Sequence, residues 1–117
     1  MLMKPNYKAP FARYVRKSHK PLQLAIEDAV EEICKHPKLG ELKVGDLAGI
    51  RVYKFRFNRQ EFLVAYRLPA PERTQEEVII EWLWIDFYQV GLHENFYDEL
   101  KRYLKSEGQN NGARKDR

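Results

Sequence analysis

Two segments near the start of the chain repeat apolar residues at helical spacing. In residues 9–17 the apolar side chains fall on one side and basic side chains cover most of the rest. A stronger pattern follows Pro21 and stops at Pro37, which predicts an amphipathic helix with an acidic outer side. Its apolar stripe consists of Leu22, Ile26, Ala29, Val30 and Ile33.

The period changes from helical to alternating after a glycine-containing loop at residues 38–49. Residues 52–57 place aromatic side chains on one face of a predicted strand and the cations Lys54 and Arg56 on the other. One face therefore belongs to the core, and the other is predicted to be open and positively charged.

Two further strands and a last helix complete the pattern. Asn58 and Arg59 predict a tight turn into a second strand at residues 60–68. Residues 78–85 are apolar enough for a central strand that is covered on both faces. Apolar residues at helical spacing then predict a final helix. They are Phe96, Leu100, Tyr103 and Leu104.

The order of these elements predicts an α+β fold in a single domain. We expect a small antiparallel β-meander, packed on one face by two N-terminal helices and one C-terminal helix, over residues 1–105. A chain of 117 residues with 44% hydrophobic composition can form one ordinary core and not two. Residues 106–117 are almost entirely polar, which predicts a disordered tail.

Charge and composition narrow the choice of partners and compartment. The 21 Lys and Arg against 17 Asp and Glu give a net charge of +4, which favours an anionic partner. The single cysteine, Cys34, lies on an apolar helix face and predicts a buried thiol. No membrane span or export signal is predicted, so we expect a cytoplasmic protein. No spacing of ligand-type residues predicts a metal or a cofactor.

Four segments, taken in order, resemble the RelE/ParE superfamily of toxins from bacterial type II toxin-antitoxin systems. They are residues 33–40, residues 45–55, residues 62–66 and the run Gly-Leu-His-Glu-Asn-Phe-Tyr at residues 91–97. The resemblance implies helices packed on a curved antiparallel sheet, and a cognate antitoxin as protein partner. Many members cut messenger RNA on the ribosome without a metal, by attack of a ribose 2′-hydroxyl on the adjacent phosphate. ParE-type members instead inhibit DNA gyrase without cutting nucleic acid. A third hypothesis for this chain is an inert relic that only binds its antitoxin.

The resemblance also assigns roles to individual residues. His93 matches the position of a histidine in several nucleases, and Tyr97 matches an aromatic residue four positions later. Such a histidine exchanges protons near neutral pH and is suited to act as acid or base. Lys54 and Arg56 resemble the strand cations that contact the scissile phosphate. Further candidates for RNA or phosphate contact are Arg51, Arg59 and Arg67.

Two departures from the family pattern leave other interpretations of the function and the fold open. The second strand has no arginine in residues 61–65, which favours the gyrase alternative, and residues 1–7 offer little for the usual first strand. Each candidate residue can also be explained by a structural role alone. His93 fits a helix start, Tyr97 fits packing against the sheet, and the cations of residues 54–56 fit a solvated strand face.

Overall fold

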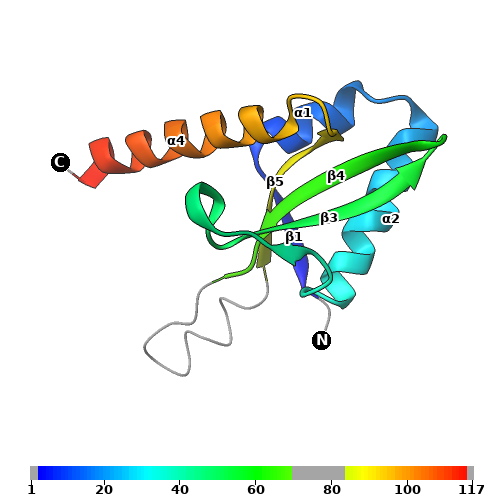
Figure 1. Cartoon of the computed structure of the whole chain (residues 1–117), viewed down its shortest axis with the longest axis horizontal. Helices are drawn as coiled ribbons and strands as arrows, with labels where there is room; N and C mark the ends of the chain where they lie inside the picture. The colour runs from blue at the N-terminus through cyan, green and yellow to red at the C-terminus, as the bar shows by residue number, and fades with distance from the viewer. Residues whose placement is uncertain (1–2, 70–83, 116–117) are drawn as a thin grey trace.

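A five-stranded sheet organises the residues that the computed structural model describes, which are 3–69 and 84–115 (Figure 1). The strand order is β1-β5-β4-β3-β2, with β1 parallel to β5 and the other neighbours antiparallel. The strands are β1 (Lys4–Tyr7), β2 (Glu41–Leu42), β3 (Ile50–Phe57), β4 (Gln60–Arg67) and β5 (Trp84–Leu92). The helices are α1 (Ala9–Lys17), α2 (Lys20–Lys35), the short 3-10 turn η1 (Gly45–Leu47) and α4 (Phe96–Lys115).

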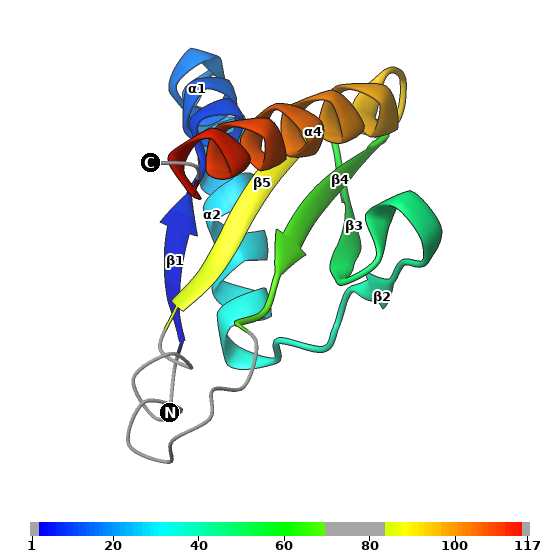
Figure 2. The same ribbon diagram turned by 90° about the vertical axis from the view of Figure 1, so that its left-hand side faces the viewer.

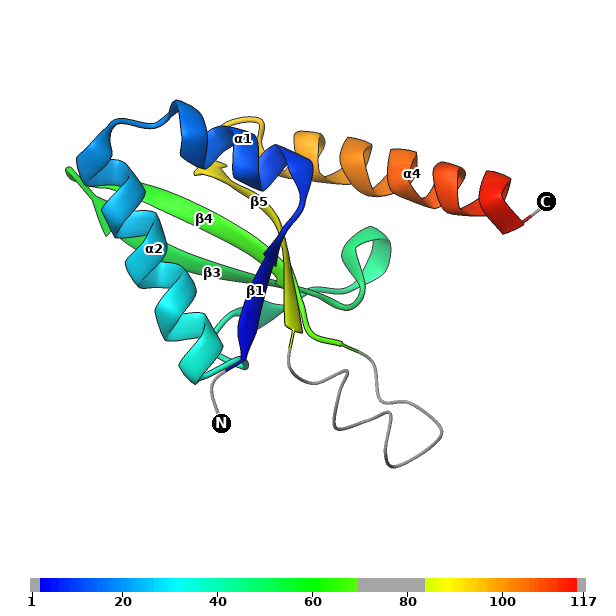
Figure 3. The same cartoon turned by 180° about the vertical axis from the view of Figure 1, so that it is seen from behind.

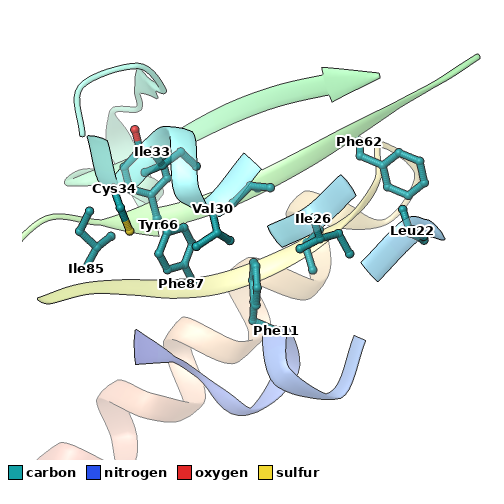
Figure 4. Packing of buried hydrophobic residues seen from close by; sticks show 12 residues of the cluster. Phe11, Leu22, Ile26, Val30, Ile33, Cys34, Phe62, Tyr66, Ile85 and Phe87 are labelled. Atoms are coloured by element: carbon teal, nitrogen blue, oxygen red, sulfur yellow. The ribbon is translucent and has the colours of Figure 1, made fainter. Parts of the chain in front are cut away.

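Helices α1 and α2 cover one face of the sheet and lie in front of it in Figure 3, and Figure 2 shows the same packing from the side. The predicted apolar stripe of α2 is buried, as is the thiol of Cys34. Figure 4 shows Val30, Ile33 and Cys34 beside Tyr66 and Phe87 of the central strands, and Leu22 next to Phe62 of β4. Both helices and the burial of the cysteine were therefore predicted correctly, because a strong helical period leaves one direction for the core.

Helix α4 packs on the opposite face of the sheet, which corrects the expectation that all helices share one face. Phe96 and Leu100 of this helix are buried in a second core with Leu63, Ala65 and Tyr88. The reason lies in β4 and β5, which carry apolar side chains on both faces and so need a cover on each side.

The hairpin of β3 and β4 forms as predicted. Asn58 and Arg59 have φ values of 56° and 68°, and β3 pairs with β4 directly across them, from Ile50 with Arg67 to Phe57 with Gln60. Positive φ at both central residues is the signature of the type I′ turn, whose twist matches that of the flanking strands.

The last strand lies further along the chain than predicted. β5 runs from Trp84 to Leu92, whereas residues 78–83 of the predicted strand lie outside the described part. The sequence pattern did not predict the later part of this strand because β5 contains the polar residues Asp86 and Gln89. In the fold, Asp86 accepts a hydrogen bond from Asn6 of β1 at 2.8 Å, and buried Gln89 donates to Glu99 of α4 at 2.9 Å.

Three short or terminal features complete the comparison with the sequence. The predicted loop at residues 38–49 contains β2 and η1, and the weak N-terminal segment contributes β1. Helix α4 continues to Lys115, into the segment predicted to be a tail, while the domain boundary at residue 105 stays a prediction. Among the described residues, no helix has the length and apolarity that a membrane crossing needs.

Candidate functional site

The register of the central strands brings three predicted site residues to the same end of the sheet. Lys54 pairs with Leu63, which pairs with Gly91 of β5. Arg56 lies two residues further along, towards the hairpin turn, and His93 follows directly after β5 ends at Leu92. β4 therefore lies between the end of β5 and β3, the strand that carries Lys54 and Arg56.

His93 stands in a turn between β5 and α4. The backbone N–H of Phe96 donates to the carbonyl of His93 at 3.1 Å, and Asn95 has a φ of 66°. Asparagine tolerates this left-handed backbone better than most residues. The His93 side chain is exposed in this turn.

Tyr97 contacts His93, although the two residues do not share a helical face as expected. Helix α4 begins at Phe96, so only Tyr97 is helical. The two rings meet edge to face with centroids 5.7 Å apart. Tyr97 is half-buried against the second core. It therefore also has the packing role that the sequence analysis gave as the structural alternative.

Lys54 and Arg56 are exposed on the face of β3 that carries α4. Alternation along the strand fixes this side, since Val52 belongs to the core beneath α4 and Phe55 to the core beneath α2. The guanidinium of Arg56 donates to the carbonyl of Arg59 in the hairpin turn at 3.2 Å. Arg59 itself is exposed at the tip.

The structure adds a lysine and a glutamate from β2 and the residue after it, which the sequence analysis did not find. The Lys43 ammonium lies 2.9 Å from a carboxylate oxygen of Glu41 and 5.7 Å from the ring centroid of Tyr97. The hydrogen bond with Glu41 raises the pKa of Lys43, and Tyr97 adds to that shift. Glu41 has its pKa lowered chiefly by Lys43, with a smaller contribution from Lys54. In the sequence, this pair was indicated only by the alternation of Glu41, Leu42 and Lys43 inside an apparent loop.

Arg51 and Arg67 do not join this group. Arg51 pairs with Tyr66 near the far end of β4, and its guanidinium donates to the carbonyl of Gly40 at 2.8 Å. Arg67 lies over the ring of Tyr88 at 5.6 Å. At about 3.4 Å per residue, roughly 17 Å of strand separates Arg67 from the end that carries His93. The Arg51 side chain is therefore engaged with the loop before β2, although its backbone pairs with Leu42, and Arg67 lies away from His93.

Two properties limit the chemistry that this surface supports. In the described ranges, no group of three or more His, Cys, Asp or Glu side chains is arranged to hold a metal ion. The residues of β4 that face α4 at this point, Leu63 and Ala65, are apolar and buried. On the same face of β4, Glu61 is exposed and pairs with Arg56. The other titratable side chains near this end of the sheet come from β3, from Glu41 and Lys43, and from the turn after β5.

Comparison with known proteins identifies one family. The family model described as the ParE-like toxin of type II bacterial toxin-antitoxin systems matches residues 6–101. This range contains the end of β1, the strands β2 to β5, the turn with His93 and the first part of α4. No curated protein and no solved structure matches the chain.

Proposed function

This chain belongs to the ParE-like toxins of type II bacterial toxin-antitoxin systems, and we propose that it acts as an endoribonuclease that cuts messenger RNA on the ribosome. As a type II toxin it has a protein antitoxin as its partner. The observation that carries the proposal is the exposed imidazole of His93, in contact with Tyr97 at the end of the sheet that also presents Lys54 and Arg56.

The proposed reaction cleaves the phosphodiester with atoms of the RNA itself. The 2′-oxygen attacks the adjacent phosphorus after a base removes its proton, and the 5′-oxygen leaves after an acid protonates it. The products are a 2′,3′-cyclic phosphate and a 5′-hydroxyl end. His93 is suited to one of these proton transfers because a histidine both accepts and donates protons near neutral pH.

The strand cations would stabilise the transition state. Negative charge builds on the nonbridging phosphate oxygens during attack, and a well-placed donor contributes roughly 3–4 kcal/mol to its stabilisation. Lys54 is the more available cation, since Arg56 already donates to the hairpin turn. Tyr97 would restrict the orientation of the imidazole through its edge-to-face contact.

The test is induction of the protein in bacteria, with mapping of RNA 5′ ends. We expect translation to stop and 5′-hydroxyl breaks to accumulate within reading frames. His93→Ala should slow cleavage by about 10²- to 10⁴-fold and relieve growth arrest. Because His93 is exposed, the same variant should change the free energy of unfolding by no more than about 0.5 kcal/mol. The matched control is His36→Ala, which removes another exposed histidine, at the end of α2.

The second candidate function is inhibition of DNA gyrase without cleavage. It is favoured by the description of the matched family as ParE-like and by the apolar inner face of β4. Intact transcripts together with DNA damage signalling would establish this function and overturn the nuclease. Binding to the antitoxin with no effect on growth would instead indicate a relic whose toxic activity is lost.

A further inference from the structure

A chain of contacts connects His93 to the edge strand β2. The imidazole meets the ring of Tyr97 with centroids 5.7 Å apart, and the Lys43 ammonium lies 5.7 Å from the centroid of the same ring. The Lys43 ammonium and the imidazole are thus separated by at most about twice that distance. Lys43 is consequently close enough to contact the same RNA strand that reaches His93.

The Glu41 carboxylate is the anion that pairs with the Lys43 ammonium in the structure. One of its carboxylate oxygens lies 2.9 Å from the Lys43 nitrogen, while its side chain is 70% exposed. Glu41 pairs with Val52 across the sheet, which places it diagonally opposite Lys54 on the same face. The charge of Lys54 also reaches this carboxylate, as the lowered pKa of Glu41 indicates. The Glu41 carboxylate therefore pairs with Lys43 and lies diagonally across from Lys54 of β3.

We propose that Lys43 is a phosphate-binding residue of the RNA site, and that the Glu41 carboxylate occupies its ammonium until a phosphodiester displaces it. This inference rests on the proposed nuclease function. A phosphodiester offers the same kind of charged oxygen as a carboxylate, and exchange of one anion for the other keeps Lys43 paired throughout. An exposed ion pair of this type contributes little to stability, so displacement costs little.

The proposal predicts opposite effects for the two partners. Lys43→Met keeps an apolar stem beside Tyr97 and removes the charge, so RNA binding should weaken several-fold. The slope of log affinity against log salt should also decrease by about 0.7, the value for one lost phosphate contact on a single strand. Lys43→Arg should restore both quantities. Glu41→Gln should tighten binding several-fold, and most of this gain should disappear in the Lys43→Met background.

The chain offers a matched control pair on α2. Lys35 and Glu31 form an exposed ion pair at 3.9 Å on the far side of the sheet. Lys35→Met and Glu31→Gln change the net charge by the same amounts as the site variants. We expect them to leave affinity and salt slope nearly unchanged. Equal effects from both pairs would mean that only net charge matters, and that result overturns the proposal.

The experiment has a binding arm and a cleavage arm, both with the full chain. The binding arm measures fluorescence anisotropy of a labelled, fully 2′-O-methylated single-stranded RNA, which keeps its phosphates and cannot be cut. The cleavage arm follows messenger breaks in a reconstituted translation reaction. Cleavage by the unmodified protein with no specific effect of Lys43 or Glu41 variants would overturn this inference and leave the nuclease standing. Lys43-dependent binding without cleavage would support the inference and overturn the nuclease, and absence of both would overturn both.

Discussion

The phenolic oxygen of Tyr66 lies 2.8 Å from the backbone nitrogen of Gly40 and accepts its hydrogen bond. The same hydroxyl donates to the carbonyl of Pro37 at 2.6 Å, so a fully buried residue of β4 holds the loop that leaves α2. Tyr66→Phe removes both bonds and leaves the buried N–H of Gly40 without an acceptor. We expect the free energy of unfolding to fall by about 1–3 kcal/mol in urea denaturation. An unchanged midpoint would show that the loop does not depend on this hydroxyl.

Gly40 is fixed by the same ring through packing. A Cβ at this position would lie 2.8 Å from both Cε1 and the hydroxyl oxygen of Tyr66, whose side chain is fully buried. Gly40→Ala should therefore lower the free energy of unfolding by about 1–3 kcal/mol. Gly108→Ala is the control, because its Cβ would meet no atom within 4 Å and alanine favours the helix. Similar stability of Gly40→Ala and the unmodified protein would contradict the predicted clash.

Arg51 also holds this loop, and we predict that its role is structural and not RNA contact. Its guanidinium donates to the carbonyl of Gly40 at 2.8 Å. Arg51→Met should lower the free energy of unfolding by about 1 kcal/mol and leave the rate of RNA cleavage unchanged at temperatures where the protein is folded. Arg56→Met should slow cleavage and lower stability less than Arg51→Met, because its bond to the carbonyl of Arg59 is exposed and longer, at 3.2 Å. A loss of cleavage in folded Arg51→Met would return this arginine to the RNA site.

Local patterns were sufficient for the elements whose side chains follow a strong period. The helix α2 and the hairpin of β3 and β4 were predicted because each buries one face and ends at recognisable residues, Pro37 and the Asn58-Arg59 turn. The exposed position of Lys54 followed from the same alternation. Membership in the ParE-like family, inferred from four short segments, is confirmed by the match over residues 6–101.

The features that were missed depend on contacts between distant parts of the chain. β2 is only two residues long and exists through pairing with β3, so the short alternation of Glu41, Leu42 and Lys43 was too weak to predict a shared surface. The extent of β5 depends on pairing with β4 and β1, which makes a strand out of a stretch containing Asp86 and Gln89. Arg51 could not be assigned its role because its acceptor is a backbone carbonyl eleven residues earlier in the chain.

The hairpin turn offers a way to stabilise the protein. Arg59 has a φ of 68°, a backbone conformation that glycine adopts without the strain felt by other residues. Arg59→Gly produces the favoured Asn-Gly type I′ sequence, and we expect the free energy of unfolding to rise by about 0.5–1 kcal/mol. Asn58→Gly should have a smaller effect, since asparagine already tolerates positive φ. A stability loss in Arg59→Gly would mean that its exposed side chain contributes more than the turn strain costs.

Tyr88 should make stability depend on pH in the alkaline range. Burial raises the pKa of its hydroxyl from 10.0 to about 12, despite the opposing charge of Arg67 above the ring. The unfolded chain releases this proton near pH 10 and the folded protein retains it, so the contribution is complete below pH 10 and is lost as the pH rises towards 12. Between these values Tyr88 should lower the free energy of unfolding by up to about 1.4 kcal/mol per pH unit. Urea denaturation of the unmodified protein and of Tyr88→Phe across this range measures the difference, because the other titrating groups are common to both. Parallel pH profiles for the two proteins would show that the hydroxyl ionises as readily in the fold as in the unfolded chain.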